Sequence, residues 1–311
     1  MDRVKTTECP LCGAKQTEHV WTCTDRYASG EEFEVCGCRN CGFRFTQDVP
    51  APQEIGRYYE TPDYISHSDT RQGLMNRLYH WVRSYMLGRK ARLVIRTTGR
   101  KKGRLLDIGT GTGYFPHTMQ QRGWQVEAVE QSRQARDFAR RHFGLEVKPA
   151  DTWQALAAGS FDAVTLWHVL EHLPQLDKVG LQLRRLLTHE GRLIVAVPNC
   201  SSYDAQHYGA DWAAYDVPRH LWHFTPDTMA AWARKQGLQL VEMHPMPMDA
   251  FYVSMLTEKE LGHKAGFLKG AWTGLKAWVA CIGHAERSSS LIYVLKADPT
   301  TPPLDTNTER L

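Results

Sequence analysis

Two pairs of cysteines near the start of the chain have the spacing of a metal site. Cys9 and Cys12 are separated by two residues and followed by glycine, and Cys38 and Cys41 repeat this CxxCG pattern. Four thiolates form a closed tetrahedral zinc site, and closed zinc sites are structural. The paired knuckles therefore predict one structural Zn²⁺ held by these four cysteines. Cys36 does not follow the pattern and is expected to lie outside the site.

A glycine-rich turn provides a second candidate for chemistry. Leu105-Leu-Asp-Ile leads into Gly109-Thr-Gly-Thr-Gly113, a GxGxG spacing with Tyr114 where a dinucleotide-binding turn needs its third glycine. A strand that ends in such a turn and opens a helix admits a ligand at the carboxyl edge of a parallel sheet. Asp107 precedes the turn and suits a ligand with a cationic group better than it suits a pyrophosphate.

Carboxylates follow the next two predicted strands. Glu130 ends the strand over 125–129, where a carboxylate can accept hydrogen bonds from both ribose hydroxyls. Asp151 follows the strand over 145–149 and is positioned for an adenine amino group. These side chains are expected to meet at one edge of a sheet.

The elements that position these residues follow from apolar periodicity. Short apolar runs predict strands at 104–108, 125–129, 145–149, 161–166, 191–197, 238–244 and 291–296. Helical patterns between them predict helices at 113–122, 132–142, 176–187 and 226–236. Strand–helix alternation with short connections predicts an α/β fold whose mostly parallel sheet is covered on both faces.

Together these passages resemble the class I S-adenosylmethionine-dependent methyltransferases, over residues 104–297. The resemblance implies a Rossmann-like, seven-stranded sheet with S-adenosyl-L-methionine as cofactor. It implies that Asp107 and the glycine turn hold the methionine part, Glu130 the ribose and Asp151 the adenine. The cofactor-binding residues that it implies are Asp107, Gly109, Thr110, Gly111, Gly113, Tyr114, Glu130, Gln131, Asp151, Trp167 and His168.

The ribbon, this domain and the passage Asp216-Val-Pro-Arg-His220-Leu-Trp-His are together similar to a bacterial group of zinc-ribbon methyltransferases. A more distant similarity is to sugar C-methyltransferases, which carry His-Glu-His-Leu after the fifth strand. The matching stretch here reads Pro218-Arg219-His220-Leu221, so His220 fits the second histidine and the first histidine and the glutamate are replaced.

Methyl transfer requires a positioned nucleophile and sometimes proton removal, for which histidine is suited near neutral pH. The resemblance makes His168 and His220 the catalytic candidates. His172 is expected to pack structurally at the start of a helix. The aromatic residues expected to form a pocket wall with His220 are Tyr203, Trp212, Tyr215 and Trp222. The alternative is a satisfied histidine that bonds Asp216 or a backbone carbonyl.

The chain is expected to contain a small zinc-ribbon module at 1–50, a helical linker or cap at 51–98 and the methyltransferase domain at 99–297. A disordered tail is expected at 298–311, and 246–290 is a helical insertion in the domain. The insertion carries an apolar face that indicates core, a homodimer contact, a substrate lid or a membrane-surface helix. That face contains Phe267, Leu268, Ala271, Trp272, Leu275, Val279 and Ile282.

Composition limits the function classes. With 42% hydrophobic and 23% charged residues, the chain has the composition of a globular protein rather than a disordered one. Its 38 basic and 34 acidic residues give a net charge of +4, too small to indicate nucleic acid by itself. Basic residues between Arg83 and Arg104 are expected to form a solvated helix face, and an RNA-binding stripe is the alternative.

The sequence therefore predicts a methyltransferase that acts on a small-molecule acceptor, such as a sugar or another secondary metabolite. No apolar run follows Met1 and no stretch is long enough to span a bilayer, so a cytoplasmic location is expected. An RNA methyltransferase and a non-catalytic, cofactor-binding scaffold stay open as alternatives.

Overall fold

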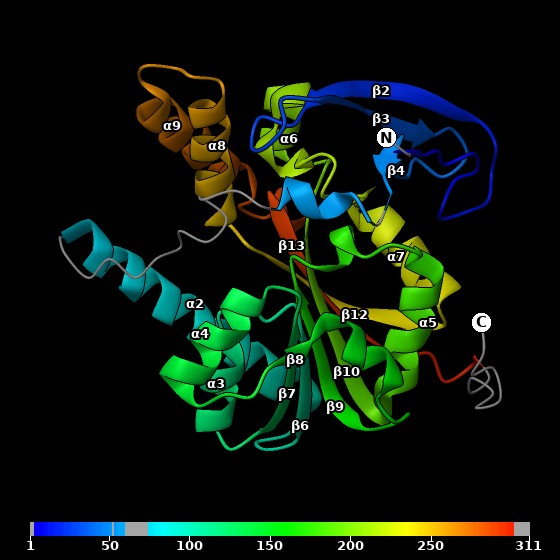
Figure 1. Cartoon of the computed structure of the whole chain (residues 1–311), viewed down its shortest axis with the longest axis vertical. Coiled ribbons are helices and arrows are strands. Elements are labelled where there is room, and N and C mark those ends of the chain that lie inside the picture. Colours follow the sequence, from blue (N-terminus) through cyan, green and yellow to red (C-terminus); the bar gives the residue numbers. More distant parts are fainter. Residues whose placement is uncertain (1–2, 52, 60–73, 302–311) are drawn as a thin grey trace.

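The computed structural model describes residues 3–51, 53–59 and 74–301, without the side chains of residues 74–82. At its centre lies a seven-stranded sheet. Its spatial order is β12 (Leu238–Pro245), β13 (Ser290–Ala297), β10 (Leu187–Pro198), β9 (Phe161–Trp167), β6 (Arg104–Ile108), β7 (Gln125–Glu130) and β8 (Lys148–Pro149). Strand β13 is antiparallel to β10 and β12, and the other neighbouring strands are parallel. The predicted α/β fold with a mostly parallel sheet is confirmed (Figure 1).

Two predicted strands begin more than one residue away from the observed start. Strand β10 begins at Leu187 instead of 191, because Leu187 already pairs with Phe161 before the register shifts at Arg192. Strand β8 is shorter than the predicted 145–149. It lies at the sheet edge and contains Pro149, which has no N–H to donate to a ladder.

Both faces of the sheet are buried. Helices α2 (Leu74–Thr98) and α3 (Tyr114–Gln121) pack on the face that includes Ile194 and Ala196. Helices α5 (Leu176–Leu186) and α7 (Pro226–Lys235) pack on the opposite face, which includes Leu193 and Val195. Helix α4 (Arg133–Phe143) connects β7 to β8. Burial on both faces explains the nearly continuous apolar run of β10.

The strand order reverses between β6 and β9. From β6 the chain builds outward through β7 and β8, then returns to place β9 on the other side of β6. Ligands of open α/β sheets bind at the carboxyl ends of strands beside such a reversal. The turn after β6 and the loop after β9, which contains the 3₁₀ helix η3 (Leu170–His172), both lie at this edge.

The N-terminal module is built into the domain. Strands β2 (Thr17–Thr24), β3 (Glu32–Cys38) and β4 (Arg44–Thr46) form an antiparallel sheet, and β1 (Arg3–Val4) pairs with β5 (Val49–Pro50). Strand β11 (Trp222–His223) lies much later in the sequence, between η5 and α7. It pairs with β4 as the fourth strand of this sheet. The sequence predicted the ribbon but not this pairing.

The predicted helical linker contains the 3₁₀ helix η1 (Ile55–Tyr58) and α2, and residues 60–73 lie outside the described part. After β8 comes η2 (Ala150–Ala155). Helix α6 (Tyr203–Tyr208) and the 3₁₀ helices η4 (Gly209–Asp211) and η5 (Ala213–Tyr215) lie between β10 and β11. Helix α6 lies beside the ribbon sheet in Figure 1.

The insertion forms a helical pair, α8 (Asp249–Glu260) and α9 (Gly266–Ala280), followed by η6 (Ala285–Arg287). Glycines let the two helices approach closely: a Cβ on Gly270 would lie 2.5 Å from Met255 Cα, and one on Gly274 would lie 2.6 Å from Phe251 Cα. The small-residue side of α9 is therefore buried. The predicted apolar face is exposed at Phe267, Leu268 and Trp272, so its interpretation as core is wrong.

The start of the predicted disordered tail has defined contacts. The Asp298 N–H donates to the Gly237 carbonyl, and Arg184 donates to the Thr301 carbonyl. Residues 298–301 therefore belong to the packed domain, while 302–311 lie outside the described part. Within the described ranges, no helix is both long and apolar enough to cross a membrane.

Candidate functional site

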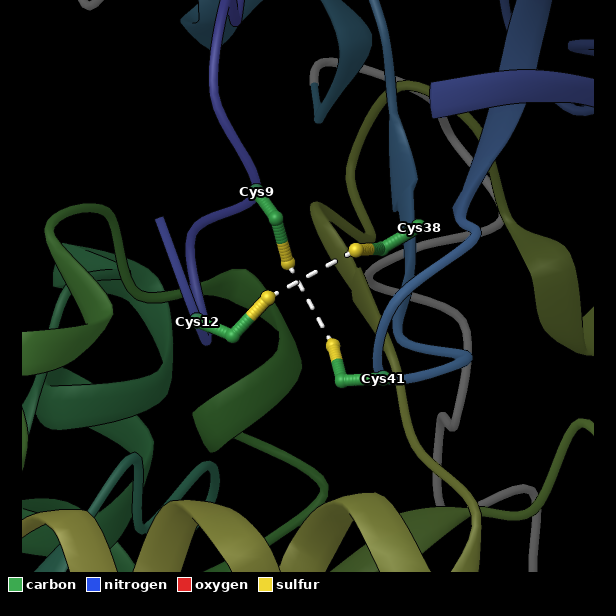
Figure 2. A group of neighbouring side chains, drawn as sticks. All are labelled: Cys9, Cys12, Cys38 and Cys41. Carbon is green, nitrogen blue, oxygen red and sulfur yellow. Dashed lines mark hydrogen bonds between the residues drawn. The ribbon is translucent and has the colours of Figure 1, made fainter. Parts of the chain in front are cut away.

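The four predicted metal ligands converge. The Sγ atoms of Cys9 and Cys41 are 3.6 Å apart, as are those of Cys12 and Cys38, and all four lie within 4.8 Å of one another (Figure 2). Tetrahedral Zn–S bonds of about 2.3 Å place sulfurs about 3.7 Å apart. The four sulfurs are therefore close enough together to be the ligands of one zinc ion. Cys36 is not a member of the cluster.

The two knuckles have the same backbone geometry. In the first, Gly13 N–H donates to the Cys9 carbonyl, and in the second, Gly42 N–H donates to the Cys38 carbonyl. Both glycines have a φ of 73°, a left-handed conformation that glycine adopts without strain. The repeated glycine in the sequence therefore reflects two identical turns around the sulfurs.

The glycine turn after β6 is folded against the end of β7. Gly109 and Thr110 N–H groups donate to the Val129 carbonyl, and Gly111 N–H donates to Glu130 Oε2 at 2.8 Å. A Cβ on Gly109 would lie 2.4 Å from Val169 Cγ2, so the turn also packs on the loop after β9. A Cβ on Gly111 would meet no described atom within 4 Å. The open side of the turn thus faces the edge where a ligand can lie.

Asp107 is buried beneath the turn. Its two carboxylate oxygens accept hydrogen bonds from the hydroxyls of Thr110, at 2.7 Å, and Thr165, at 2.6 Å. Burial raises the pKa of Asp107 to about 6, although both hydroxyls and the Lys90 ammonium oppose the shift. The chain therefore maintains a carboxylate where burial disfavours its charge, which is typical of functional sites.

The remaining predicted cofactor residues lie around the same edge. The second oxygen of Glu130 accepts from the Ser132 N–H, and Gln131 between them is exposed. Asp151 is exposed in η2, after β8. Tyr114 begins α3 after Gly113, with the Arg83 guanidinium 3.9 Å from its ring centroid.

Trp167 ends β9, and His168 follows it in the loop beside the glycine turn. The Lys90 ammonium lies 4.3 Å from the Trp167 ring centroid, and the Phe115 ring packs edge-on at 5.3 Å. The buried Trp167 Nε1–H has no acceptor within the described ranges. Burial lowers the pKa of Lys90, and the Asp249 and Asp107 carboxylates oppose that shift.

His168 has a strained backbone and two carboxylate neighbours. Its φ is 58°, a left-handed conformation that costs a residue with a Cβ of the order of 1 kcal/mol or more. Its Nε2 lies 3.3 Å from Asp249 Oδ2, and its Nδ1 lies 3.5 Å from Glu171 Oε1. Burial alone would lower its pKa, but these carboxylates raise the pKa of His168 to about 9. The side chain is about one-third exposed, so His168 reaches both the buried Glu171 and the open edge.

His220 lies deeper than the sequence predicts. It is 8% exposed, its Nδ1 is 2.9 Å from the Ala214 carbonyl oxygen, and its ring contacts that of His172 edge-on. Its Nε2 is 3.8 Å from Asp216 Oδ2 and 4.0 Å from Glu171 Oε1. The structure thus places both predicted catalytic histidines beside Glu171, a residue that sequence reasoning did not select.

The predicted aromatic pocket wall around His220 is wrong. Trp212 and Tyr215 are buried in the core between ribbon and domain, where Trp212 donates to Asp204 and the Tyr215 hydroxyl accepts from Trp21. Trp222 stacks on Phe43 of the ribbon and donates to the Leu173 carbonyl. Tyr203 stacks on His207 instead. Trp212, Tyr215 and Trp222 hold the ribbon on the domain, and the small pocket that Trp212 and Tyr215 line together with Asp25 and Arg219 does not include His220.

Several of the basic residues between Arg83 and Arg104 have partners within the chain. Besides Arg83 and Lys90, they include Arg96, which donates to Glu242, and Arg100, which pairs with Asp162. The sequence places Lys90 on the solvated helix face. In the structure it lies four residues after Met86 and four before Val94, and both of these residues pack in the core. The spacing of four residues from these apolar positions could have shown that Lys90 lies on the buried side of the helix.

Arg219, which replaces the glutamate of the sugar-enzyme motif, is a buried residue held by ion pairs. Its guanidinium pairs with Asp25 of the ribbon at 2.9 Å and with Asp216 at 2.6 Å, and it also donates to the Tyr58 carbonyl. The side chain is 2% exposed. Arg219 therefore connects ribbon, linker and domain.

Comparisons with known proteins match the domain that carries the glycine turn. Residues 79–243 match the family described as Methyltransferase domain. The Ubiquinone biosynthesis O-methyltransferase of Xanthomonas oryzae pv. oryzae is 32% identical over 157 residues, which cover 46% of this chain and 65% of that one. The protein of the same name from Cupriavidus pinatubonensis is 29% identical over 185 residues, covering 54% of this chain and 74% of that one. The chain thus spans a little under two thirds of the first relative's length.

Among solved structures, the 1,6-didemethyltoxoflavin-N1-methyltransferase of Burkholderia thailandensis superposes with a TM-score of 0.47 at 17% identity. The match covers 84% of this chain and 98% of that one.

Proposed function

The chain belongs to the methyltransferase domain family, which matches more than half of its length, and we propose that it transfers a methyl group from S-adenosylmethionine to a small-molecule acceptor. The observation that carries this proposal is the glycine turn tied to Glu130 at the carboxyl edge of β6, where the strand order reverses. A ligand at that edge meets the open side of Gly111 and the Glu130 carboxylate together.

The residues present fit this cofactor. Each Glu130 oxygen accepts one backbone N–H, and a carboxylate has about four acceptor positions, so two remain for ribose hydroxyls. We propose that Gly109, Thr110, Gly111, Gly113 and Tyr114 enclose the methionine part above Asp107, with Gln131 beside the ribose. Asp151 is proposed to reach the adenine.

When bound, S-adenosylmethionine supplies a methyl group on a sulfonium. That methyl group would be available for in-line transfer to an acceptor placed opposite the sulfur. The chain must therefore hold the acceptor in line and exclude water. Lys90 over Trp167 supplies a positive charge at the edge of the site, which supports binding of an anionic group such as the methionine carboxylate.

We propose His168 as the catalytic residue that touches the acceptor, and His220 as a positioning residue that acts through Glu171. Support comes from the greater exposure of His168 and from its place directly after Trp167, whereas His220 is 8% exposed behind Glu171. Because the raised pKa keeps His168 protonated near neutral pH, it can donate a hydrogen bond that orients the acceptor, and His168→Ala should lower kcat.

The acceptor is proposed to be a small molecule that is methylated on oxygen, because the relatives in Xanthomonas and Cupriavidus are O-methyltransferases. A sugar or another secondary metabolite with a free hydroxyl meets this description. The intramolecular contacts of Arg83, Lys90, Arg96 and Arg100 give no support to an RNA-binding stripe.

The test is to incubate the protein with S-adenosylmethionine labelled on the methyl carbon and with fractionated lysate. Label in small metabolites is the expected result. Label recovered in RNA would overturn the proposal in favour of RNA methylation. Binding of S-adenosylhomocysteine without transfer to any fraction would overturn it in favour of a scaffold.

We propose further that the chain is a cytoplasmic homodimer. The four clustered thiols support a reducing compartment, where such cysteines bind metal and do not form disulfides. The exposed apolar face of α9 supports self-association, because Phe267, Leu268 and Trp272 are each at least 60% exposed side by side. Sedimentation equilibrium should give twice the chain mass, and Trp272→Ser should shift it toward the monomer.

A further inference from the structure

Behind His168, a buried carboxylate faces two imidazoles. Glu171 and His172 belong to η3, and His220 comes from the loop that precedes β11. The carboxylate of Glu171 is 0% exposed, and one ligand atom from each residue lies within 4.8 Å of the other two. A second, independent observation concerns the glutamate itself. Both of its oxygens are buried without a hydrogen bond from the residues that the structure describes, and Oε1 has only the longer contacts with His168 Nδ1, at 3.5 Å, and His220 Nε2, at 4.0 Å.

The two histidines have the same orientation toward backbone carbonyls. His172 Nδ1 is 3.1 Å from the Arg219 carbonyl oxygen and 3.2 Å from the Tyr59 hydroxyl, and His220 Nδ1 is 2.9 Å from the Ala214 carbonyl oxygen. A carbonyl can only accept, so each Nδ1 carries a proton and donates it. In a neutral ring this leaves the lone pair on Nε2. Metal-ligating histidines are held in this way, with the distal N–H bonded to a carbonyl or carboxylate.

The two Nε2 lone pairs and the carboxylate therefore converge, and the cationic group already paired with the carboxylate is His168, whose Nδ1 is 3.5 Å from Glu171 Oε1. His220 Nε2 is 4.0 Å from Glu171 Oε1, beyond hydrogen-bond distance, and 3.8 Å from Asp216 Oδ2. Asp216 itself is engaged by the Arg219 guanidinium. His168, the other neighbour of Glu171, is 3.5 Å away and also faces Asp249. A cation among these atoms would satisfy the carboxylate and both lone pairs at once.

We propose that Glu171, His172 and His220 form a binding site for a divalent transition-metal ion, distinct from the four-cysteine cluster. Two imidazoles and one carboxylate are ligands that suit Zn²⁺, Fe²⁺ or Co²⁺. Metal–ligand bonds of about 2.0–2.2 Å place ligand atoms roughly 3–4.4 Å apart, so a small inward movement of the side chains completes the site. Three protein ligands leave a coordination position open, as in catalytic metal sites.

The position of the site suggests a role for the ion in activating the acceptor. Glu171 directly contacts His168, which the proposed function places at the acceptor. An acceptor hydroxyl in the open position would lose its proton more readily, because a bound divalent ion lowers the pKa of a coordinated oxygen. This role rests on the proposed methyl transfer, whereas the binding of the ion does not.

The test counts metal in the full-length chain. Protein equilibrated with excess Co²⁺ and desalted should contain two equivalents, one from each site. The cysteine cluster gives intense thiolate-to-cobalt absorption in the near ultraviolet, and an oxygen–nitrogen site gives only weak visible bands. Glu171→Gln and His220→Ala should each weaken the second equivalent at least about 100-fold, beyond the range for second-shell losses, and leave the thiolate absorption unchanged. His207→Ala, an exposed histidine on α6, is the control and should retain both.

A measurement on the unmodified chain keeps the test decisive if a variant fails to fold. Protein already carrying one equivalent at the cysteines is titrated with Zn²⁺ in a calorimeter. A further stoichiometric binding event supports the site. A single equivalent at saturating metal would overturn the proposal, as would two equivalents retained by folded Glu171→Gln. None of these outcomes depends on methyl transfer, so failure of this site and failure of the proposed function are distinguishable.

Discussion

At the scale of single residues, Asp107 is a buried carboxylate at the position proposed for the methionine part of the cofactor. Its pKa is raised to about 6 from an ordinary value near 3.8, so the folded protein holds a proton more tightly than the unfolded chain does. The stability that protonation contributes is complete below about pH 4 and is lost as the pH rises through 6. Above pH 6 the ionised carboxylate destabilises the fold.

Replacing this carboxylate should therefore stabilise the protein most at high pH. The free energy of unfolding of Asp107→Asn relative to the natural protein should rise by about 1 kcal/mol between pH 5 and pH 8, since each pKa unit corresponds to 1.36 kcal/mol. Cofactor affinity should fall in the same variant. Urea denaturation at both pH values measures the change, and Glu146→Gln, at an exposed position, is the control. A pH-independent difference would contradict the assigned shift.

Glu130 carries the second prediction at this scale. Removal of its carboxylate in Glu130→Ala should weaken binding of S-adenosylhomocysteine at least tenfold, about 1.4 kcal/mol, because charge-assisted hydrogen bonds to the ribose are lost. The turn also loses the bond to Gly111 N–H. Calorimetry measures the affinity, and Glu127→Ala on the same strand is the matched control. Unchanged affinity would remove Glu130 from the proposed ribose site.

Spacing predicted some of these residues and could not predict others. Asp107, Gly111 and Glu130 were predicted because strand–turn–helix order fixes which residues reach the carboxyl edge. Lys90 and Glu171 were not, because their positions depend on which face of a helix is buried and on contacts between distant segments. Glu171 meets His220 only because the chain folds back after β10.

At the scale of elements, the ribbon depends on its cysteine cluster and on β11. Cys38→Ser should lose one equivalent of zinc, because a tetrahedral thiolate site needs all four ligands, whereas Cys36→Ser should retain it. Metal analysis of the purified variants measures the difference. Since Cys38 ends β3, which pairs with β2 and β4, its loss should also lower the melting temperature. Loss of zinc in Cys36→Ser with retention in Cys38→Ser would reverse the assignment.

Helices and strands were predictable where the apolar pattern extends over many residues. The elements that each of them packs against or pairs with were not. The helix over 226–236 follows directly from Thr225 and Pro226, and the structure places it at Pro226–Lys235 with Thr225 as its N-cap. Strand β11 has only two residues, too few for a period, and forms because β4 offers an unpaired edge. In α9 the apolar residues predicted a helix face, but the glycines opposite them determine which side is buried.

At the scale of the whole molecule, one buried cation connects the parts. The Arg219 guanidinium bridges Asp25 of the ribbon and Asp216 of the domain, and it donates to the Tyr58 carbonyl of the linker. Asp25 is buried as well and also accepts backbone N–H groups of the β2–β3 turn. The cost of burying these charges is thus offset by their ion pairs, and the offset needs both carboxylates and the guanidinium.

Removing that cation should destabilise the whole chain. Arg219→Met leaves Asp25 buried without its partner, so the free energy of unfolding should fall by about 3–5 kcal/mol. Arg26→Met, which breaks the exposed ion pair with Asp211, should cost less than about 1 kcal/mol and serves as the control. Urea denaturation followed by tryptophan fluorescence measures both, because Trp21 of the ribbon and Trp212 of the domain report on the shared core. If Arg219→Met unfolded at the same denaturant concentration as Arg26→Met, ribbon and domain would be stable independently and the shared core would not act as one unit.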